Sequence, residues 1–334
     1  MTKSNRPEVT AVVLTMGDRD EMLRLVLARL SALPVAEVLV VDNSEQSGVE
    51  ELARAWPRVR VLRPGRNVGV AARNLAAREA AHGFLLMLED DAYPLPGAVE
   101  ALLDAMEADP GLAVAGGLVR DVDGEGRVTL VDEVGTFDWF LRAGRSVEVP
   151  AEGLPVDFFA EGCSLIRRDP FLEVGGFFEP YFFTVSEVDL TTRLLAAGWD
   201  VRYFPAAAFD HMKPEGHGEG SKLSLRYRVR NNAWYFWLRF PAAQAAWRIP
   251  AYGLFDLIEC SYRRMPGAWF RGMWEAWRER GSVRAHRDPV PRALIRRVEI
   301  NRGRLHLRLL VEGLRKRLLG RPAASRRSTP GARG

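Results

Sequence analysis

Short apolar runs alternate with helical patterns along the first 120 residues of the chain. The runs are continuously apolar, which is typical of strands whose two faces are both buried. Between them, apolar side chains recur every three or four residues, as on one face of a helix. We predict strands over Val9–Thr15, Val35–Val41, Val59–Leu62 and Phe84–Leu88, and helices over Asp20–Leu30, Val49–Ala55 and Asn67–Ala81.

Strands that alternate with helices are typical of right-handed βαβ units and a mainly parallel sheet. The pattern continues with a helix over Ala98–Ala108, a strand over Leu112–Arg120 and a loop with short strands over 121–155. From Ser221 it becomes helical, with predicted interruptions at Pro241, Pro250, Pro266 and Pro289. We therefore predict an α/β fold, a doubly wound and mainly parallel sheet flanked by helices, with a helical C-terminal extension. The later predicted elements are strands Phe158–Arg167 and Val201–Phe204 and helix Ser186–Ala197.

Three parts follow from this pattern. Residues 1–220 form the α/β domain in two halves, 1–120 and 121–220, and residues 221–320 form the helical extension. The Arg-, Ser- and Pro-rich tail over 321–334 is predicted to be disordered. The two cysteines lie far apart without metal-type spacing, so we expect a reducing, cytoplasmic setting. No signal peptide or membrane span is expected, because no uncharged apolar run reaches ~18 residues.

The net charge of +4 is modest, but arginine and tryptophan are concentrated after Ser221. This favours an anionic partner, and a solvated helical face is the alternative. For this C-terminal region we expect packing on the α/β domain together with a homodimer interface. Peripheral membrane contact is the second expectation. No nucleic-acid partner is expected. The tryptophans are Trp234, Trp237, Trp247, Trp269, Trp274 and Trp277.

Polar residues follow each of the four predicted strands of the first half. Ligands of parallel sheets bind beyond the carboxyl ends of the strands, so the sequence predicts a binding site at this edge. The residues are Thr15 after the first strand, Asp42 and Asn43 after the second, Arg66 and Asn67 after the third, and Glu89, Asp90 and Asp91 after the fourth.

The three consecutive acids repel one another at the end of a buried strand, which a divalent cation would offset. Mg²⁺ and Mn²⁺ prefer carboxylate, water and phosphate oxygens. The alternative is an acid cluster at a helix start that needs no metal. His211 follows the last predicted strand and could complete a metal site, although a lone histidine is more often structural.

Two further segments carry candidate chemistry. Gly69 permits close backbone approach at a helix start that favours phosphate, and this helix carries Arg73 and Asn74. Alternatively, the segment before this helix has a structural role in which Asn67 caps the helix. Glu187 and Asp189 are too close to share one helical face, so one could act as a general base while the other supports the helix. Alternatively, the two acids only stabilise the start of the helix through the helix dipole.

Over roughly residues 9–240, these segments resemble the inverting family 2 glycosyltransferases of GT-A fold. VLVVDNSEQSG resembles the nucleotide-contacting strand end and implies that Asp42 contacts the base. RNVGVAARN resembles the Asn-x-Gly helix start. LLMLEDDAYP resembles the Asp-x-Asp segment and implies that Asp91 is a metal ligand, with Glu89 where the family usually has Asp. His211 falls where the family has its metal-binding histidine.

The resemblance makes residues 1–120 the donor half and 121–220 the acceptor half, which contains the long motif from Glu161 to Pro205. It departs from the family at Ser186-Glu187-Val188-Asp189-Leu190, where the family commonly has Glu-Asp-x-Asp-Leu. By register Glu187 takes the position of the base. The acceptor-side residues implied by the motif are Glu161, Gly162, Gly176 and Phe177.

The resemblance implies metal-assisted single displacement with inversion, using Mg²⁺ or Mn²⁺. The donor would be a UDP-, dTDP- or GDP-linked sugar, and likeness to rhamnosyltransferases favours a deoxysugar. The acceptor would be a glycan, a lipid-linked compound or a small molecule, in the cytoplasm or at the inner face of the cell membrane. The alternatives are a sugar nucleotidyltransferase and a catalytically impaired scaffold that binds a membrane or partner.

Overall fold

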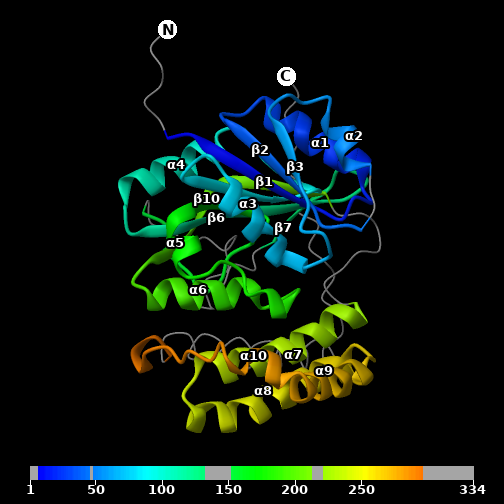
Figure 1. The fold of residues 1–334 in the computed structure, drawn as a ribbon, viewed down its shortest axis with the longest axis vertical. Helices are drawn as coiled ribbons and strands as arrows, with labels where there is room; N and C mark the ends of the chain where they lie inside the picture. Colours follow the sequence, from blue (N-terminus) through cyan, green and yellow to red (C-terminus); the bar gives the residue numbers. More distant parts are fainter. Residues whose placement is uncertain (1–6, 46–47, 132–151, 213–220, 296–334) are drawn as a thin grey trace.

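One mixed sheet organises the α/β domain in the computed structural model, which describes residues 7–45, 48–131, 152–212 and 221–295 (Figure 1). Its strands run in the order β3-β2-β1-β4-β9-β6-β10-β5, with β7 paired to β6 and β8 to β10. The strands are β1 (Val9–Thr15), β2 (Glu37–Asp42), β3 (Val59–Leu62), β4 (Phe84–Glu89), β5 (Ala92–Pro94), β6 (Leu112–Val122), β7 (Val128–Val131), β8 (Leu154–Pro155), β9 (Cys163–Arg167) and β10 (Asp200–Met212).

The sheet combines a parallel N-terminal half with antiparallel insertions. Strand β1 pairs in parallel with β2 and β4, and β2 with β3, as expected of βαβ units. Strand β9 is antiparallel to both β4 and β6, whereas β6 and β10 are parallel. The predicted α/β fold with a mainly parallel sheet is confirmed.

Helices cover both faces of the sheet. On one face α1 (Asp20–Ser31), α2 (Val49–Ala53) and α4 (Ala98–Ala108) share a core cluster with Val9, Ala11 and Val13 of β1. On the other, Val12 packs in a second cluster with side chains of four further helices. The continuous apolarity of β1 therefore reflects burial on both faces. The helices of the second face are η1 (Gly69–Ala72), α3 (Arg73–Glu79), α5 (Arg168–Glu173) and α6 (Ser186–Ala196).

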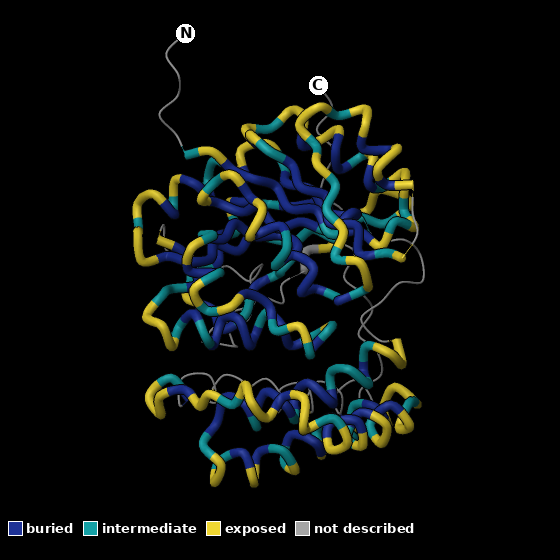
Figure 2. The backbone as a smooth tube through the Cα atoms, viewed as in Figure 1, coloured by how far each residue is buried: buried dark blue, intermediate teal, exposed yellow. Residues whose placement is uncertain are grey.

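The C-terminal helices form a separate layer beneath α6 (Figures 1 and 2). Within this layer, α7 packs directly on the α/β domain, because its Trp234 and Tyr235 share a core cluster with Tyr181 and Val188. Among the described residues, no helix is long and apolar enough to cross a membrane. The helices are α7 (Lys222–Arg239), α8 (Ala242–Tyr262), α9 (Pro266–Arg278) and α10 (Arg280–Arg284), and a short turn, η2 (Glu179–Tyr181), precedes α6.

Several boundaries differ from the sequence-based predictions. Strand β10 continues to Met212 instead of ending at Phe204, because a register shift between Phe204 and Ala208 absorbs the Pro205 segment. Strand β6 continues to Val122 instead of ending at Arg120. Pro250 lies inside α8 without ending it. Residues 132–151 of the loop, residues 296–320 of the extension and the tail over 321–334 lie outside the described residues.

Candidate functional site

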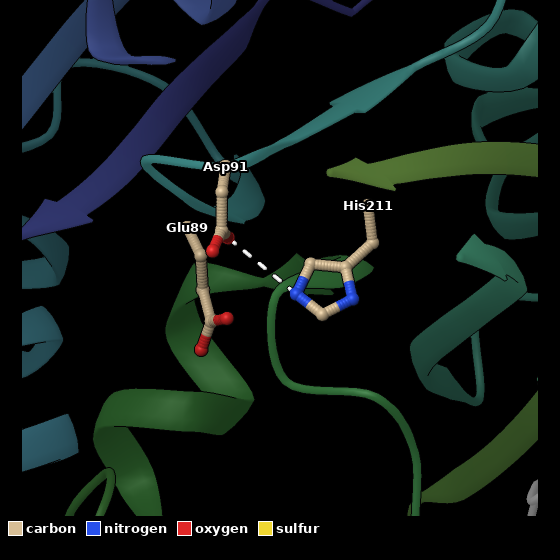
Figure 3. A group of neighbouring side chains, drawn as sticks. All are labelled: Glu89, Asp91 and His211. Atoms are coloured by element: carbon tan, nitrogen blue, oxygen red, sulfur yellow. Dashed lines mark ion pairs between the residues drawn. The ribbon is translucent and has the colours of Figure 1, made fainter. Parts of the chain in front are cut away.

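Glu89, Asp91 and His211 meet at the carboxyl edge of the parallel strands (Figure 3). Each offers one ligand atom, and these atoms lie within 4.8 Å of one another. Glu89 ends β4 and Asp91 follows in the turn to β5. The backbone N–H of Met212 donates to the Asp91 carbonyl oxygen at 2.7 Å, which ties the turn to the histidine-bearing strand. Two carboxylates from the end of β4 and the turn that follows it thus meet an imidazole from β10.

His211 is oriented by a carboxylate on the neighbouring strand. His211 and Asp121 are register partners of β10 and β6, and their Nδ1 and Oδ1 atoms lie 2.8 Å apart. With its Nδ1–H donated to Asp121, the imidazole presents Nε2, which lies 3.6 Å from Asp91 Oδ1. A carboxylate on the far ring nitrogen is the arrangement that metal-binding histidines commonly have.

The donor set fits a hard divalent cation. Asp91 is buried, and its Oδ1 atom has no hydrogen-bond partner among the described residues. Burial and the neighbouring Glu89 carboxylate raise the pKa of Asp91, although His211 and Arg19 oppose the shift. A cation between these groups would favour the ionised carboxylate and use the unpaired oxygen.

Asp90 faces the first strand instead of the metal cluster. Its Oδ2 accepts a hydrogen bond of 2.6 Å from Thr15 Oγ1, while Oδ1 lies 3.4 Å from Arg19. Arg19 also forms an ion pair with Asp91. Burial raises the pKa of Asp90 to about 6, against the hydrogen bond from Thr15. Arg19 thus brings a positive charge to the acidic edge, next to the loop after β1.

The ends of β2 and β3 form a second polar corner. Asp42 is fully buried; its Oδ1 accepts a 2.6 Å hydrogen bond from Ser44 Oγ, and its Oδ2 lies 2.8 Å from Arg63. Asn43 donates to Asn67 Oδ1 at 3.0 Å. It also donates to the Gly69 carbonyl and accepts from the Val68 N–H. Asn67 therefore lies at the start of η1 as predicted, in a network that fixes this turn against β2.

A fully buried arginine lies beneath the acidic cluster. Arg73 of α3 lies 3.6 Å from Glu89 and 3.9 Å from Glu161, and donates to the Leu88 carbonyl at 3.3 Å. Gly162 leaves room for this arrangement, since a Cβ there would lie 2.8 Å from Glu89 Cγ. Burial raises the pKa of Glu161 to about 8, opposed by Arg73 and reinforced by Glu187 and Glu89. The positive charge of Arg73 thus offsets negative charge on Glu89 and Glu161.

The two acids at the start of α6 have different environments. Glu187 is half-buried, and its charge acts on Glu161 beside the metal cluster. Asp189 is fully buried between Arg193 and Arg239, at 2.8 Å and 2.7 Å, and accepts from Tyr181 at 3.3 Å. Although burial opposes it, these arginines lower the pKa of Asp189. Asp189 therefore belongs to an internal ion-pair network, and Glu187 lies on the side of the acidic cluster.

The model of the family described as "Glycosyl transferase family 2" matches residues 11–175, the stretch that supplies the polar corner at the ends of β2 and β3 and the acidic turn after β4. Residues 11–175 belong to glycosyl transferase family 2. A Mycobacterium tuberculosis N-acetylglucosaminyl-diphospho-decaprenol L-rhamnosyltransferase is 28% identical over 269 residues, covering 72% of this chain and 86% of the relative. The protein is a glycosyltransferase, as the sequence predicts.

Solved structures place the glycosyltransferase in the GT-A fold. A Pyrobaculum calidifontis mannosyltransferase, in complex with GDP-Man and Mn²⁺, aligns with a TM-score of 0.53 at 16% identity, over 95% of this chain and 89% of that chain. S. aureus TarS, in complex with UDP-GlcNAc, aligns with a TM-score of 0.56 at 13% identity, over 95% and 93%. At such identities the likeness shows the fold alone.

The glycosyltransferase holds the segment before α6 in a strained conformation. Phe182, Thr184 and Val185 have φ values of 63°, 61° and 64°, a region that side chains with a Cβ rarely adopt. Asn231 of α7 donates to the carbonyls of Tyr181, Phe183 and Thr184 at 2.9, 2.6 and 3.0 Å. The C-terminal layer thus stabilises the backbone that leads into Glu187.

Gly69 closes the other side of this segment. The Val70 N–H donates to the Phe182 carbonyl at 2.9 Å, and a Cβ at Gly69 would collide with that carbonyl. We expect Gly69→Ala to lose about 1–3 kcal/mol more free energy of unfolding than Gly65→Ala, by the cost of overpacking. Gly65 is the matched control, because its φ is also positive but nothing lies within 4 Å. Equal losses in urea unfolding would contradict the close contact.

Several predicted residues line a cavity instead of the acidic cluster. This cavity of about 850 Å³ lies between the catalytic domain and the C-terminal helices. Asn74 fixes the backbone of Phe177 on one side of the cavity through two hydrogen bonds. Its Nδ2 donates to the Phe177 carbonyl at 2.8 Å, and its Oδ1 accepts from the Phe177 N–H at 2.9 Å. Arg66 pairs there with Glu179. The predicted residues on its lining are Arg66, Asn67, Asn74, Gly176 and Phe177.

Sequence reasoning did not predict four residues that shape the site. Arg19 and Arg63 follow strands β1 and β3, so the rule for polar residues at strand ends could have included them. Asp121 lies in the segment predicted as a loop with short strands, and only its register with His211 reveals its position. Asn231 acts through contacts with carbonyls 47 to 50 residues earlier in the chain, which no local pattern contains.

Proposed function

We propose that this glycosyltransferase moves a sugar from a nucleoside-diphosphate donor to an acceptor hydroxyl by single displacement with inversion. The observation that carries the proposal is the convergence of Glu89, Asp91 and His211 within 4.8 Å at the sheet edge. Asp42 and Asn67 lie along the same edge and would contact the nucleoside. Two alternatives, a sugar nucleotidyltransferase and a catalytically impaired scaffold, make different predictions in the assay below.

Asp91 and His211 would hold Mg²⁺ or Mn²⁺, with Glu89 beside them. When bound, such a cation neutralises charge on the leaving nucleoside diphosphate. Asp121 orients His211 so that Nε2 faces the cluster. Arg19 would place its guanidinium near the donor phosphates, where planar arginine donors match phosphate oxygens. Arg73 forms ion pairs with Glu89 and Glu161.

Glu187 would accept the proton of the acceptor hydroxyl while the hydroxyl oxygen attacks the anomeric carbon. Its half-buried side chain on the acidic side of α6 supports this role, and the arginine cage around Asp189 argues against the same role there. A base on the face opposite the leaving group gives inversion. A product with retained anomeric configuration would contradict this assignment.

A lipid-linked acceptor is the class that the comparisons favour. The name of the M. tuberculosis relative specifies a decaprenol-linked acceptor and transfer of L-rhamnose. We therefore propose a deoxyhexosyl donor and a polyprenyl-diphosphate-linked acceptor. With such an acceptor, the enzyme would work in the cytoplasm at the inner face of the cell membrane.

A donor screen that measures nucleoside diphosphate release tests the proposal. UDP-, dTDP- and GDP-sugars are each incubated with the full chain, with and without Mn²⁺, after treatment with a chelator. We expect release from one nucleotide class, stimulated by the metal. Pyrophosphate release would instead favour the nucleotidyltransferase, and absence of donor hydrolysis with every nucleotide would favour the scaffold.

Asp121→Asn is expected to weaken metal affinity about 10–100-fold, the usual effect of losing the partner of a metal-binding histidine. The change removes the charge that holds His211 but keeps the shape of the side chain. Mn²⁺ titration by electron paramagnetic resonance measures the affinity without turnover. Asp123→Asn, in the exposed turn that follows β6, serves as the control. An unchanged Mn²⁺ affinity in Asp121→Asn would remove His211 from the metal site.

A further inference from the structure

Two stripes of exposed apolar side chains lie on the C-terminal layer. On α8 and on α9 the exposed residues recur at intervals of four and seven, as on one face of a helix. We call them together the aromatic face. Its members are 42–63% exposed: Trp247, Leu254, Ile258, Tyr262, Phe270, Trp274 and Trp277.

Both stripes point away from the catalytic domain. The opposite sides of α8 and α9 are buried against α7, for example through Tyr252 and Asp256 of α8 and through Gly272 and Glu275 of α9. Helix α7 in turn lies next to the domain (Figures 1 and 2). The two helices are joined by a 2.6 Å hydrogen bond between Trp269 Nε1 and the Gly253 carbonyl. Their exposed stripes therefore lie on two adjacent helices, each on the side away from α7.

The surface around these side chains is basic. Residues 242–284 contain seven arginines and four acids. Two of the acids, Asp256 and Glu275, are buried towards α7, which leaves an excess of positive charge outside. Arginine guanidinium groups lie over the rings, at 4.2 Å for Arg278 on Trp274 and 4.7 Å for Arg280 on Trp277. Amphipathic rings with adjacent guanidinium groups suit a boundary between apolar chains and phosphates.

We propose that the aromatic face docks the enzyme peripherally on an anionic lipid surface. Tryptophan and tyrosine rings favour the headgroup level of a bilayer, and arginine binds lipid phosphates. A second copy of the chain suits this face less well, because a symmetric contact would oppose two arginine-rich surfaces. The inference stands on the aromatic face alone and holds whatever acceptor the enzyme uses.

Sedimentation of the full chain with vesicles tests the proposal without turnover. We expect binding at low ionic strength to phosphatidylcholine vesicles that contain phosphatidylglycerol, and weaker binding without it. Replacing Trp274 and Trp277 by Ser should weaken partitioning about tenfold or more per side chain, since each ring leaves an apolar environment. Val128→Ser, at an exposed apolar residue of β7, should bind as the unaltered protein does.

A charge reversal provides a second arm. Arg271→Glu should weaken binding to the anionic vesicles, whereas Arg54→Glu, directly after α2, should not, although both arginines pair with an acid three or four residues away in the chain. Absence of binding by the unaltered chain, or equal binding by the Trp274 and Trp277 variant, would overturn the proposal. So would sedimentation velocity showing a dimer that the same tryptophan substitutions dissociate, because the face would then be a contact between copies.

Discussion

Glu187→Gln is expected to lower kcat by about 10²–10⁴-fold, the usual contribution of a general base. The amide keeps the size of the side chain but cannot accept a proton from the acceptor hydroxyl. Because Glu187 is half-buried in the first turn of α6 and the amide occupies the same volume, the melting temperature should change little. Steady-state transfer with the donor found in the screen measures the effect.

The pH profile separates this role from a structural one. In the unaltered enzyme, kcat should rise with pH on the acidic limb as the base ionises, and Glu187→Gln should lack that limb. Glu173→Gln, at an exposed glutamate of α5, is the matched control and should keep both rate and profile. A normal kcat in Glu187→Gln would assign the proton transfer to another group.

Asp189→Asn is expected to destabilise the fold by about 3–5 kcal/mol, the cost of breaking a buried ion pair on one side. The substitution leaves Arg193 and Arg239 next to a neutral amide, with only 12% and 5% of their side chains exposed. Because the arginines lower the pKa of Asp189, its contribution to stability is present above the unfolded pKa of about 3.9 and is lost as pH falls through the lower folded value. Urea unfolding near neutral pH measures the loss.

The control for Asp189 is an exposed pair of the same kind. Asp169 lies 3.9 Å from Arg168 with 90% of its side chain exposed, so Asp169→Asn should leave stability nearly unchanged. Below its unfolding transition, the Asp189 variant should retain more turnover than Glu187→Gln. The reverse pattern, with a normal melting temperature and a large loss of kcat in Asp189→Asn, would make Asp189 the base.

The fold of residues 1–120 could be predicted from the sequence because its signals are local. Buried parallel strands are continuously apolar, and their ends carry the polar residues of the site, so order and edge follow from the pattern. The later part of the α/β domain was harder to predict. Pro205 and the alanines after it interrupt the apolar run of β10, and only pairing with β6 keeps these residues in the sheet. His211 was consequently placed after a strand instead of within one.

The division of roles between Glu187 and Asp189 could not be predicted from spacing. The two side chains lie two residues apart, and their difference comes from Arg239, fifty residues later on α7. In the same way, Asp121 became visible only through its register with His211. The sequence identifies the types of group that the site uses, whereas contacts between distant segments determine which of them bind, react or support.

The three carbonyls held by Asn231 also bear on how the chain is divided. The predicted domain boundary at residue 220 separates α7 from every candidate catalytic residue, yet α7 supplies both this clamp and Arg239. In a chimera between relatives, therefore, the part that must stay together extends through α7 to Arg239. A chimera that grafts C-terminal helices from a relative should place its junction in the turn between α7 and α8, at Phe240-Pro241.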